Sequence, residues 1–394
     1  MDALGSAGLL DLQEAAGRPE ARPSAAQLLP GTALSEGIPR LERLLLAAAR
    51  AAPPALDGAA AALVGAGGKR VRPLLALLSA RAAHPGRRSR GRVALAVAAE
   101  LIHSATLLHD DVIDDGLTRR GLPAPRVAYG NSVSVLAGDW LLTTALDLAL
   151  RSRVPGAVEA LVRTLRELVA GEARQLSLRG STDFTPDDAL AVGRLKTGSL
   201  FAFCGEAGAL AARASRKAVL SLHAFGGHAG TAFQISDDLL DFQADAQTLG
   251  KAVLADVSEG KPSLPLALAL QRLPALRTEL ADLLAESKEV EKALRARELL
   301  SPPDSPPEAE VPMAPDAPGA LGIAPGGAPP ETEALRARSR AFATRLAHTG
   351  ALGAAHRVAE QERDAALLSL ENLSASPTRD LLGQVATLLL ERSR

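Results

Sequence analysis

The sequence predicts an all-α protein built from a bundle of long helices. Aromatic residues make up only 2% of the chain, so the core must consist of Ala, Leu and Val, which favours closely packed helices over sheets. Long apolar runs without Gly or Pro also recur, as in A-L-A-V-A-A-E-L-I-H over 94–103. With 394 residues, 47% of them hydrophobic, the chain can bury one large core or two smaller ones.

Charge and cysteine content exclude several classes of protein. The 44 Lys and Arg nearly balance the 45 Asp and Glu, and no basic domain stands out, which argues against a nucleic-acid partner. The single cysteine, Cys204, rules out an intramolecular disulfide and fits a cytoplasmic location. No apolar run approaches the length that spans a bilayer, so we expect no transmembrane segment.

The chain divides into a short extension and one helical domain. Residues 1–32 contain Gly, Pro and scattered charge but no signal-peptide pattern, and we expect a flexible extension. Residues 33–394 form the domain. Helical patterns cover 38–52, where Pro53 and Pro54 end the first helix, then 138–150 and 158–178, and they resume at 331. Residues 301–330 hold ten of the 26 prolines, which predicts a disordered insertion.

Two acidic clusters carry the strongest functional signal. Asp110, Asp111 and Asp114 end an apolar helical run, followed by Asp115. Residues four apart share a helix face, about 6 Å apart, where two carboxylates repel by roughly 3 kcal/mol unless a cation lies between them. Such oxygen ligands suit Mg²⁺. The alternative is an acidic, solvent-exposed helix end.

The second cluster repeats the spacing of the first more than a hundred residues later. Asp237, Asp238 and Asp241 lie in F-Q-I-S-D-D-L-L-D-F, again among apolar residues. Two unrelated exposed faces would not explain this repetition. Facing each other across a cavity, the two clusters would hold several metal ions between them.

These motifs resemble those of the trans-isoprenyl diphosphate synthases of the polyprenyl synthetase family, most of all the long-chain, octaprenyl-type enzymes. The family's two DDxxD motifs correspond to D-D-V-I-D at 110–114 and D-D-L-L-D at 237–241. Further matches, in the family's order, are G-G-K-R-V-R-P at 67–73, E-L-I-H at 100–103, R-R-G at 119–121, K-T-G-S-L-F at 196–201, L-G-K at 249–251 and D-V-S-E-G-K-P-S-L-P at 256–265. The resemblance implies the isoprenoid synthase fold, with helices around a central cavity, and a homodimer.

The resemblance also implies the substrates and the cofactor. It predicts Mg²⁺ held by the six aspartates, three ions per active site when substrate is bound, an allylic diphosphate and isopentenyl diphosphate. Lys69 and Arg72 would bind isopentenyl diphosphate, with Arg70 a weaker candidate, although the segment alone could be a solvated basic loop. His103 would touch the same diphosphate, or serve as a structural hydrogen-bonding group.

Other cations and polar groups complete the predicted substrate site. The resemblance assigns Arg119 to the allylic substrate and Arg120 to isopentenyl diphosphate, while the alternative pairs them with Asp114 or Asp115. Lys196 and Thr197 would contact the allylic diphosphate, unless Lys196 only extends to solvent. The remaining predicted contacts are Gln234, Lys251 and Lys261. Asp256 and Glu259 would orient the two lysines or simply solubilise their loop.

The predicted reaction extends an allylic diphosphate by five-carbon units. Ala105 and Thr106 lie five and four positions before Asp110, where bulky aromatics in the family stop growth early. Because both are small, we predict a product of C30 or longer, about C40, for quinone side chains, released with peripheral membrane contact. Both could instead be ordinary packing residues, and the alternative product is farnesyl or geranylgeranyl diphosphate. A class I terpene cyclase and a non-catalytic synthase subunit are the other candidates.

Overall fold

The computed structural model describes residues 37–86, 91–119, 122–243, 257, 259–300 and 330–391. The predicted extension at 1–32 and nearly all of the predicted insertion at 301–330 lie outside this part. Two of the predicted substrate contacts, Arg120 and Lys251, lie outside it as well.

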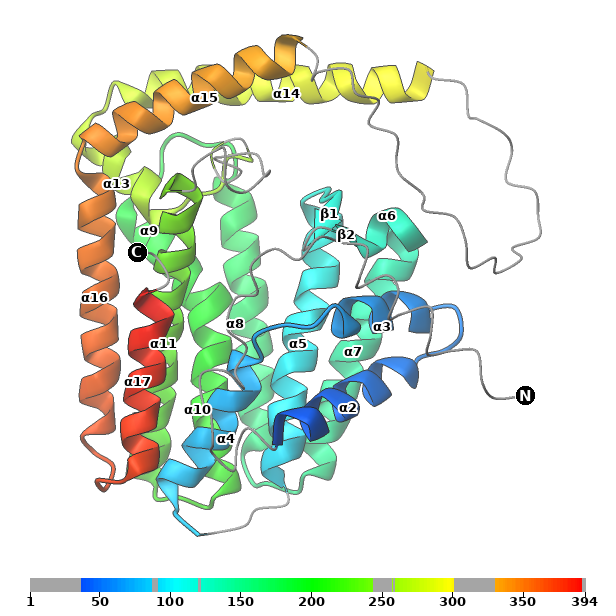
Figure 1. Cartoon of the computed structure of the whole chain (residues 1–394), viewed down its shortest axis with the longest axis vertical. Coiled ribbons are helices and arrows are strands. Elements are labelled where there is room, and N and C mark those ends of the chain that lie inside the picture. The colour runs from blue at the N-terminus through cyan, green and yellow to red at the C-terminus, as the bar shows by residue number, and fades with distance from the viewer. Residues whose placement is uncertain are drawn as a thin grey trace.

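Long helices run side by side through most of the molecule (Figure 1). The first helices are α2 (Gly37–Arg50), α3 (Asp57–Gly65) and α4 (Val71–Ala83). Helix α2 coincides with the predicted helix at 38–52. It buries Leu41, Leu45 and Ala49, which recur every four residues along one face, as the sequence pattern requires.

Helix α5 (Gly91–Ile113) carries the first acidic motif at its C-terminal end. A two-residue-per-strand hairpin follows, in which β1 (Thr118–Arg119) pairs antiparallel with β2 (Leu122–Pro123). The short helix α6 (Pro125–Tyr129) then leads into α7 (Asn131–Arg151), which packs along α5. Consequently the end of α5 lies beneath the hairpin, at the upper end of the bundle in Figure 1.

The middle of the chain supplies the other walls of the site. It consists of α8 (Ala157–Leu178), α9 (Pro186–Gly193), the π-helix η1 (Arg194–Gly198), α10 (Ser199–Ala211) and α11 (Arg216–Gln243). Helices α10 and α11 touch backbone to backbone, because a Cβ on Gly205 would lie 2.0 Å from the carbonyl oxygen of Leu222. This close approach places the second acidic motif, at the end of α11, beside the π-helix.

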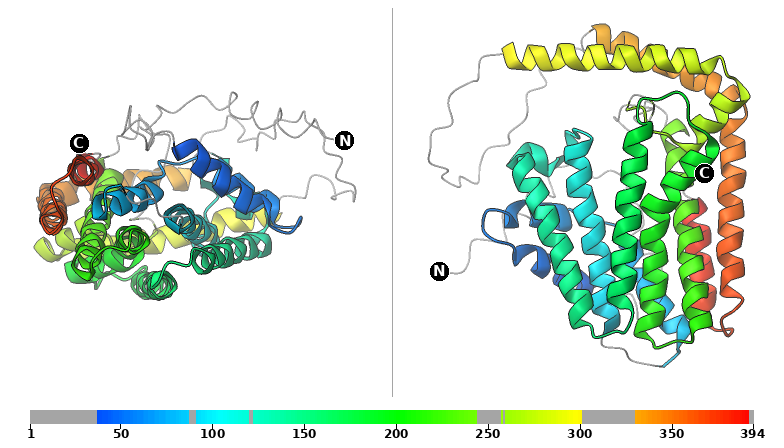
Figure 2. Two further views of the ribbon diagram at one scale, coloured as in Figure 1. Left: turned by 90° about the horizontal axis from the view of Figure 1, so that it is seen from below. Right: turned by 180° about the vertical axis from the view of Figure 1, so that it is seen from behind.

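The C-terminal helices cover one side and one end of the bundle. Helices α13 (Leu264–Arg272), α14 (Leu276–Leu300) and α15 (Pro330–His348) lie beyond the end that carries the acidic motifs, with α14 and α15 packed together across it. Helices α16 (Ala351–Leu370) and α17 (Pro377–Glu391) return alongside α11. Figure 2 shows the same arrangement from below and from behind.

Two apolar cores meet near the ends of α5 and α11. The larger one joins α4, α5, α7, α10 and α11. The smaller one surrounds Ile235 and Leu239 with side chains from α13 to α16. The described residues contain almost no strand, so the predicted all-α class is confirmed, and its core is made largely of Ala and Leu.

The expectation that no segment is long and apolar enough to span a bilayer is wrong by length and composition. Helices α5 and α7 both pass that test, because a window average tolerates scattered polar residues. The apolar window of α5 is 67% buried, as expected of a core helix, whereas that of α7 is only 33% buried. Helix α7 therefore leaves some apolar side chains exposed in the single chain, namely Val135, Leu136 and Leu150.

Candidate active site

The two acidic motifs share one cavity, which we call the acid-lined cavity. It has a volume of about 220 Å³ and is bounded by α5, α8, α9, η1, α11 and the segment before α13. Asp110 and Asp114 reach it from one side and Asp238 from the other. Its remaining lining residues are Leu107, Arg119, Gln175, Ala189, Val192, Gly193, Lys196, Gln234, Lys261, Pro262 and Ser263. Three of the six aspartates named by the metal hypothesis therefore line one cavity.

Each carboxylate of the first motif faces a different cation. Lys196 Nζ lies 3.5 Å from Oδ2 of Asp110, and Nη1 of Arg179 lies 2.9 Å from Oδ1 of Asp114. Burial raises the pKa of Asp110, an effect that the nearby Lys196 opposes. The acids therefore point inward among cations and are not a solvated helix end.

Asp111 is the most deeply buried of these acids, at 2% exposure. The Nε of Arg119 donates to its Oδ1 at 2.7 Å, and its Oδ2 has no hydrogen-bond partner. The alternative pairing of Arg119 with Asp114 or Asp115 is wrong, because Asp115 follows the end of α5 and pairs with Arg126 instead. The hairpin thus brings Arg119 back over α5, eight residues after its partner.

The second motif lies on the last turns of α11. Asp238 and Asp241 are half-buried and Asp237 is exposed. Gln234, one turn earlier, donates from Nε2 to Asp238 at 2.8 Å and accepts a hydrogen bond from Thr197 at 2.5 Å. The predicted contacts Thr197 and Gln234 are therefore linked to each other and to the second motif.

The π-helix η1 presents Lys196 to the cavity, whereas Thr197 is buried and contacts the lining residue Gln234. The π-helix lies close against α8, where a Cβ on Gly171 would approach Leu195 Cβ and the Lys196 nitrogen at 2.9 Å. Lys196 pairs with Glu172 at 2.5 Å in addition to Asp110. A π-turn of this kind is frequent at functional sites, because the extra residue redirects the side chains of one helical turn.

A buried carboxylate fixes the outer side of the π-helix. Glu362 of α16 accepts hydrogen bonds from Arg194 at 2.9 Å and pairs with His228 of α11 at 2.6 Å. Burial by itself raises the pKa of Glu362, but the hydrogen bonds from His228 and Arg194 outweigh it, so the pKa lies below the ordinary value. Helices α11 and α16 thus hold the first residue of η1.

In the basic segment at the start of α4, Arg70 has a structural role. Arg70 is buried and donates to Glu42, Glu100 and the carbonyl oxygen of Val64. The ion pairs more than offset the cost of burial and raise its pKa. This arrangement differs from the substrate-binding role predicted for Arg70, because its guanidinium is fully used inside the protein.

Arg72 lies over an aromatic ring of α10. Its guanidinium carbon lies 5.1 Å from the ring centre of Phe201, which stacks on Phe233, the residue before Gln234. Burial lowers the pKa of Arg72, and its Nε has no hydrogen-bond partner. Lys69, Arg72 and His103 are not among the residues that line the acid-lined cavity.

Three polar residues on or just after α8 belong to the site but were not predicted from the sequence. Glu172, Gln175 and Arg179 contact or line the cavity, and none was predicted. The three-residue spacing of Glu172 and Gln175 places them on one face of α8, and Arg179 directly follows that helix. The polar character of these three positions was the available signal in the sequence. Lys261, in contrast, was predicted and does line the cavity, where it pairs with Glu259 and Asp114.

The donor set fits a divalent metal held jointly with a substrate. Within the described residues, no three acidic, histidine or cysteine side chains stand close enough to hold an ion by themselves. Mg²⁺ commonly takes one or two carboxylates and fills its shell with waters and substrate phosphates. Asp110 and Asp114 on one wall and Asp238 on the other suit that mode, and the surrounding cations suit a diphosphate.

Comparisons with known proteins identify relatives of this chain. The family model for polyprenyl synthetase matches residues 53–300. The chain is 36% identical over 306 residues to nonaprenyl diphosphate synthase of Mycobacterium tuberculosis, covering 74% of this chain and 91% of that one. It is 38% identical over 208 residues to octaprenyl diphosphate synthase of Escherichia coli, covering 53% and 64%.

A solved structure extends the likeness to nearly the whole chain. A polyprenyl synthase from Caulobacter crescentus, complexed with calcium and isoprenyl diphosphate, has a TM-score of 0.73 at 30% identity and covers 95% of this chain and 99% of that one. Together with the helical fold, these relatives define a prenyltransferase of the isoprenoid synthase fold. The chain belongs to the polyprenyl synthetase family.

Proposed function

We propose that the protein is an all-trans polyprenyl diphosphate synthase that condenses isopentenyl diphosphate with an allylic diphosphate. The observation that carries the proposal is the shared cavity, in which both DDxxD motifs face a set of cations. Asp110, Asp111 and Asp114 with Asp237, Asp238 and Asp241 would hold Mg²⁺. When bound, Mg²⁺ supplies Lewis-acid assistance to departure of the diphosphate.

The chain's own residues then position two substrates. Lys196, Thr197 and Arg119 hold the allylic diphosphate, while Gln234 orients Thr197 and Asp238. As the allylic C–O bond breaks, its electron pair leaves with the diphosphate. The double bond of isopentenyl diphosphate, held by Lys69, Arg72, His103 and Arg120, attacks the allylic carbon, and the released diphosphate accepts the proton that is lost.

The proposed product is long, C30 or longer and about C40. Ala105 and Thr106 lie on α5 before the first motif, and both are small. The long-chain relatives described above support this assignment. The proposed location is the cytoplasm, with peripheral membrane contact during product release.

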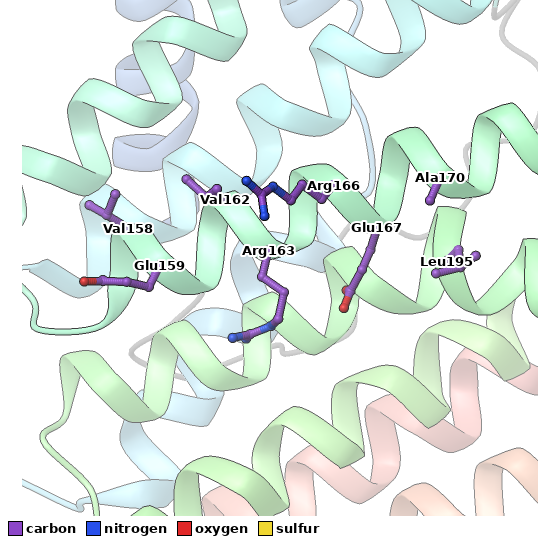
Figure 3. A pocket seen from close by; sticks show the side chains of 8 residues that line it. All are labelled: Val158, Glu159, Val162, Arg163, Arg166, Glu167, Ala170 and Leu195. Carbon is purple, nitrogen blue, oxygen red and sulfur yellow. The ribbon is translucent and has the colours of Figure 1, made fainter.

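We also propose a homodimer in which α7 and α8 of each copy meet. On α8, Val162, Val169 and Leu176 are exposed at a seven-residue spacing, and Leu136 and Leu150 are exposed on α7. A depression of about 550 Å³ runs along α8 from Val158 past Arg166 to Ala170, and Leu195 of η1 also lines it (Figure 3). An apolar stripe of this length on a soluble monomer is uncommon, and a second copy would cover it.

Product analysis tests the proposed reaction. Purified protein is incubated with Mg²⁺, labelled isopentenyl diphosphate and farnesyl diphosphate, and the products are sized by chromatography. The expected result is a series of linear products that reaches C30 or beyond and disappears in the D110N and D238N variants. A cyclic hydrocarbon would instead support a terpene cyclase, and absence of turnover by the purified chain would support a non-catalytic subunit.

A further inference from the structure

Asp114 has a counter-ion on each of its two carboxylate oxygens. Nη1 of Arg179 lies 2.9 Å from Oδ1, and Nζ of Lys261 lies 3.3 Å from Oδ2. Lys261 belongs to the segment expected to bind diphosphate, whereas nothing in the motif pattern marks Arg179. A divalent ion that binds Asp114 competes with these two cations, because each of them already contacts one of its carboxylate oxygens.

Arg179 has a second contact, made by Nε, besides its ion pair with Asp114. It follows the last residue of α8, and its Nε donates to the carbonyl oxygen of Glu259 at 3.1 Å. The adjacent Gly180 nitrogen donates to the carbonyl oxygen of Gly260 at 2.9 Å. A Cβ on Gly260 would lie 2.7 Å from the Gly180 nitrogen, so the two segments touch at their backbones.

This anchoring ties Arg179 to the wall of the acid-lined cavity. Glu259 pairs with Lys261, and residues 261–263 line the cavity directly. A guanidinium released from Asp114 would stay within reach of an anion bound there, because its Nε remains attached to the same wall. Guanidinium groups bind phosphate oxygens through two parallel hydrogen bonds, which makes arginine well suited to this exchange.

We propose that Arg179 is a further diphosphate-binding residue, which exchanges the Asp114 carboxylate for the allylic diphosphate when a divalent ion binds Asp114. The inference rests on the proposed prenyl-transfer function. Under this proposal, Arg179 weakens metal binding and strengthens diphosphate binding. The guanidinium competes with the metal for Asp114, and it strengthens binding of the diphosphate.

The Arg179→Gln variant separates these two effects. Without substrate, we expect the variant to bind Mn²⁺ at least about threefold more tightly than the natural protein, because a competing positive charge is gone. At saturating Mg²⁺, we expect it to bind inorganic diphosphate about tenfold more weakly, because a charge-assisted hydrogen bond is lost. Electron paramagnetic resonance measures the first affinity, and isothermal titration calorimetry the second.

The control is Arg174→Gln, in the last turns of α8, whose side chain pairs with Asp188 at the surface. It should leave both affinities unchanged, and Arg179→Lys should restore part of the diphosphate affinity. Weakening of both metal and diphosphate binding in Arg179→Gln would indicate a merely structural role and overturn the inference, as would two unchanged affinities. Turnover by the natural protein is measured alongside, and its absence would count against the proposed function and not against Arg179 alone.

Discussion

Lys196 and Asp110 face each other at the acid-lined cavity, with the ammonium nitrogen 3.5 Å from Oδ2 of the carboxylate. The lysine comes from the π-helix and the carboxylate from the end of α5. This pair therefore links η1 to α5 at the cavity where we expect a diphosphate to bind. A lysine that merely extended to solvent would have no reason to pair with both Asp110 and Glu172.

Replacing Lys196 with Met should raise the KM for the allylic diphosphate by about tenfold or more, since a charged partner of the phosphate oxygens is lost. The KM for isopentenyl diphosphate should change much less. Steady-state kinetics with each substrate varied in turn measures both values. The matched control is Lys217→Met, an exposed lysine near the start of α11. If the two variants had the same KM for the allylic diphosphate, Lys196 would not bind this substrate.

Replacing Ala105 with Phe should shorten the product. Ala105 is 2% exposed within the larger core, so an aromatic ring at this position must take space from its neighbours. Overpacking of this kind costs about 1–3 kcal/mol of stability, so thermal unfolding is measured together with chain length. Ala105→Val serves as an intermediate step. A folded Phe variant with an unchanged product series would remove Ala105 from the control of chain length.

Replacing Val169 with Glu should convert the dimer to a monomer. Val169 is 69% exposed at the centre of the apolar stripe on α8, where two copies would bury two carboxylates at once. Multi-angle light scattering after gel filtration gives the mass directly. Leu368→Glu is the control, because Leu368 is 63% exposed on α16, away from α7 and α8. A dimer that survives the Val169 change would place the interface elsewhere.

Stability should depend on pH through Glu362. Its pKa is depressed in the folded protein, so its ion pairs stabilise the fold above the unfolded-state pKa, about 4.3, and this contribution is lost as the pH falls through the lower, folded value. The stability difference between the natural protein and Glu362→Gln should therefore be largest near neutral pH and shrink below about pH 4. Urea unfolding at a series of pH values measures it. Glu371→Gln, exposed at the end of the same helix, is the control, and a difference that does not vary with pH would contradict the assignment.

Replacing residues 301–329 with a short Gly/Ser linker should spare turnover. Helices α14 and α15, which border this segment, pack against each other, so their association does not depend on the sequence between them. Closing a shorter loop changes the free energy of folding only modestly. Turnover and thermal unfolding are compared with those of the natural chain. Loss of turnover in a soluble, folded variant would assign the segment a role in the reaction.

The fold and the meeting of the acidic motifs could be predicted because both depend on local patterns. Helix α2 follows from the spacing of Leu41, Leu45 and Ala49, and the common helical face of Asp110 and Asp114 follows from their four-residue spacing. The repetition of that spacing at Asp237 and Asp241 indicated a common cavity, which Asp110, Asp114 and Asp238 do line.

Ion-pair partners could not be predicted because they depend on how distant segments cross. Arg119 pairs with Asp111 and not with Asp114 or Asp115, since the hairpin returns over the side of α5. In the sequence, Arg70 lies between Lys69 and Arg72 and looks as suited as they are to bind a diphosphate. In the structure, however, its guanidinium forms ion pairs with Glu42 of α2 and Glu100 of α5. The contact of Arg179 with Asp114 likewise joins residues 65 positions apart.

The wide turn at Arg194–Gly198 makes the site sensitive to the length of the chain in a way that side-chain substitutions are not. A π-turn accommodates one residue more than an ordinary helical turn, so deleting one residue here to restore the regular pitch would leave α9 and α10 nearly in phase but would change the directions of the side chains between them. Lys196 and Thr197 would then no longer both face Asp110 and Gln234, which they now contact. A single-codon deletion in this turn should thus abolish turnover even where every charged group is retained.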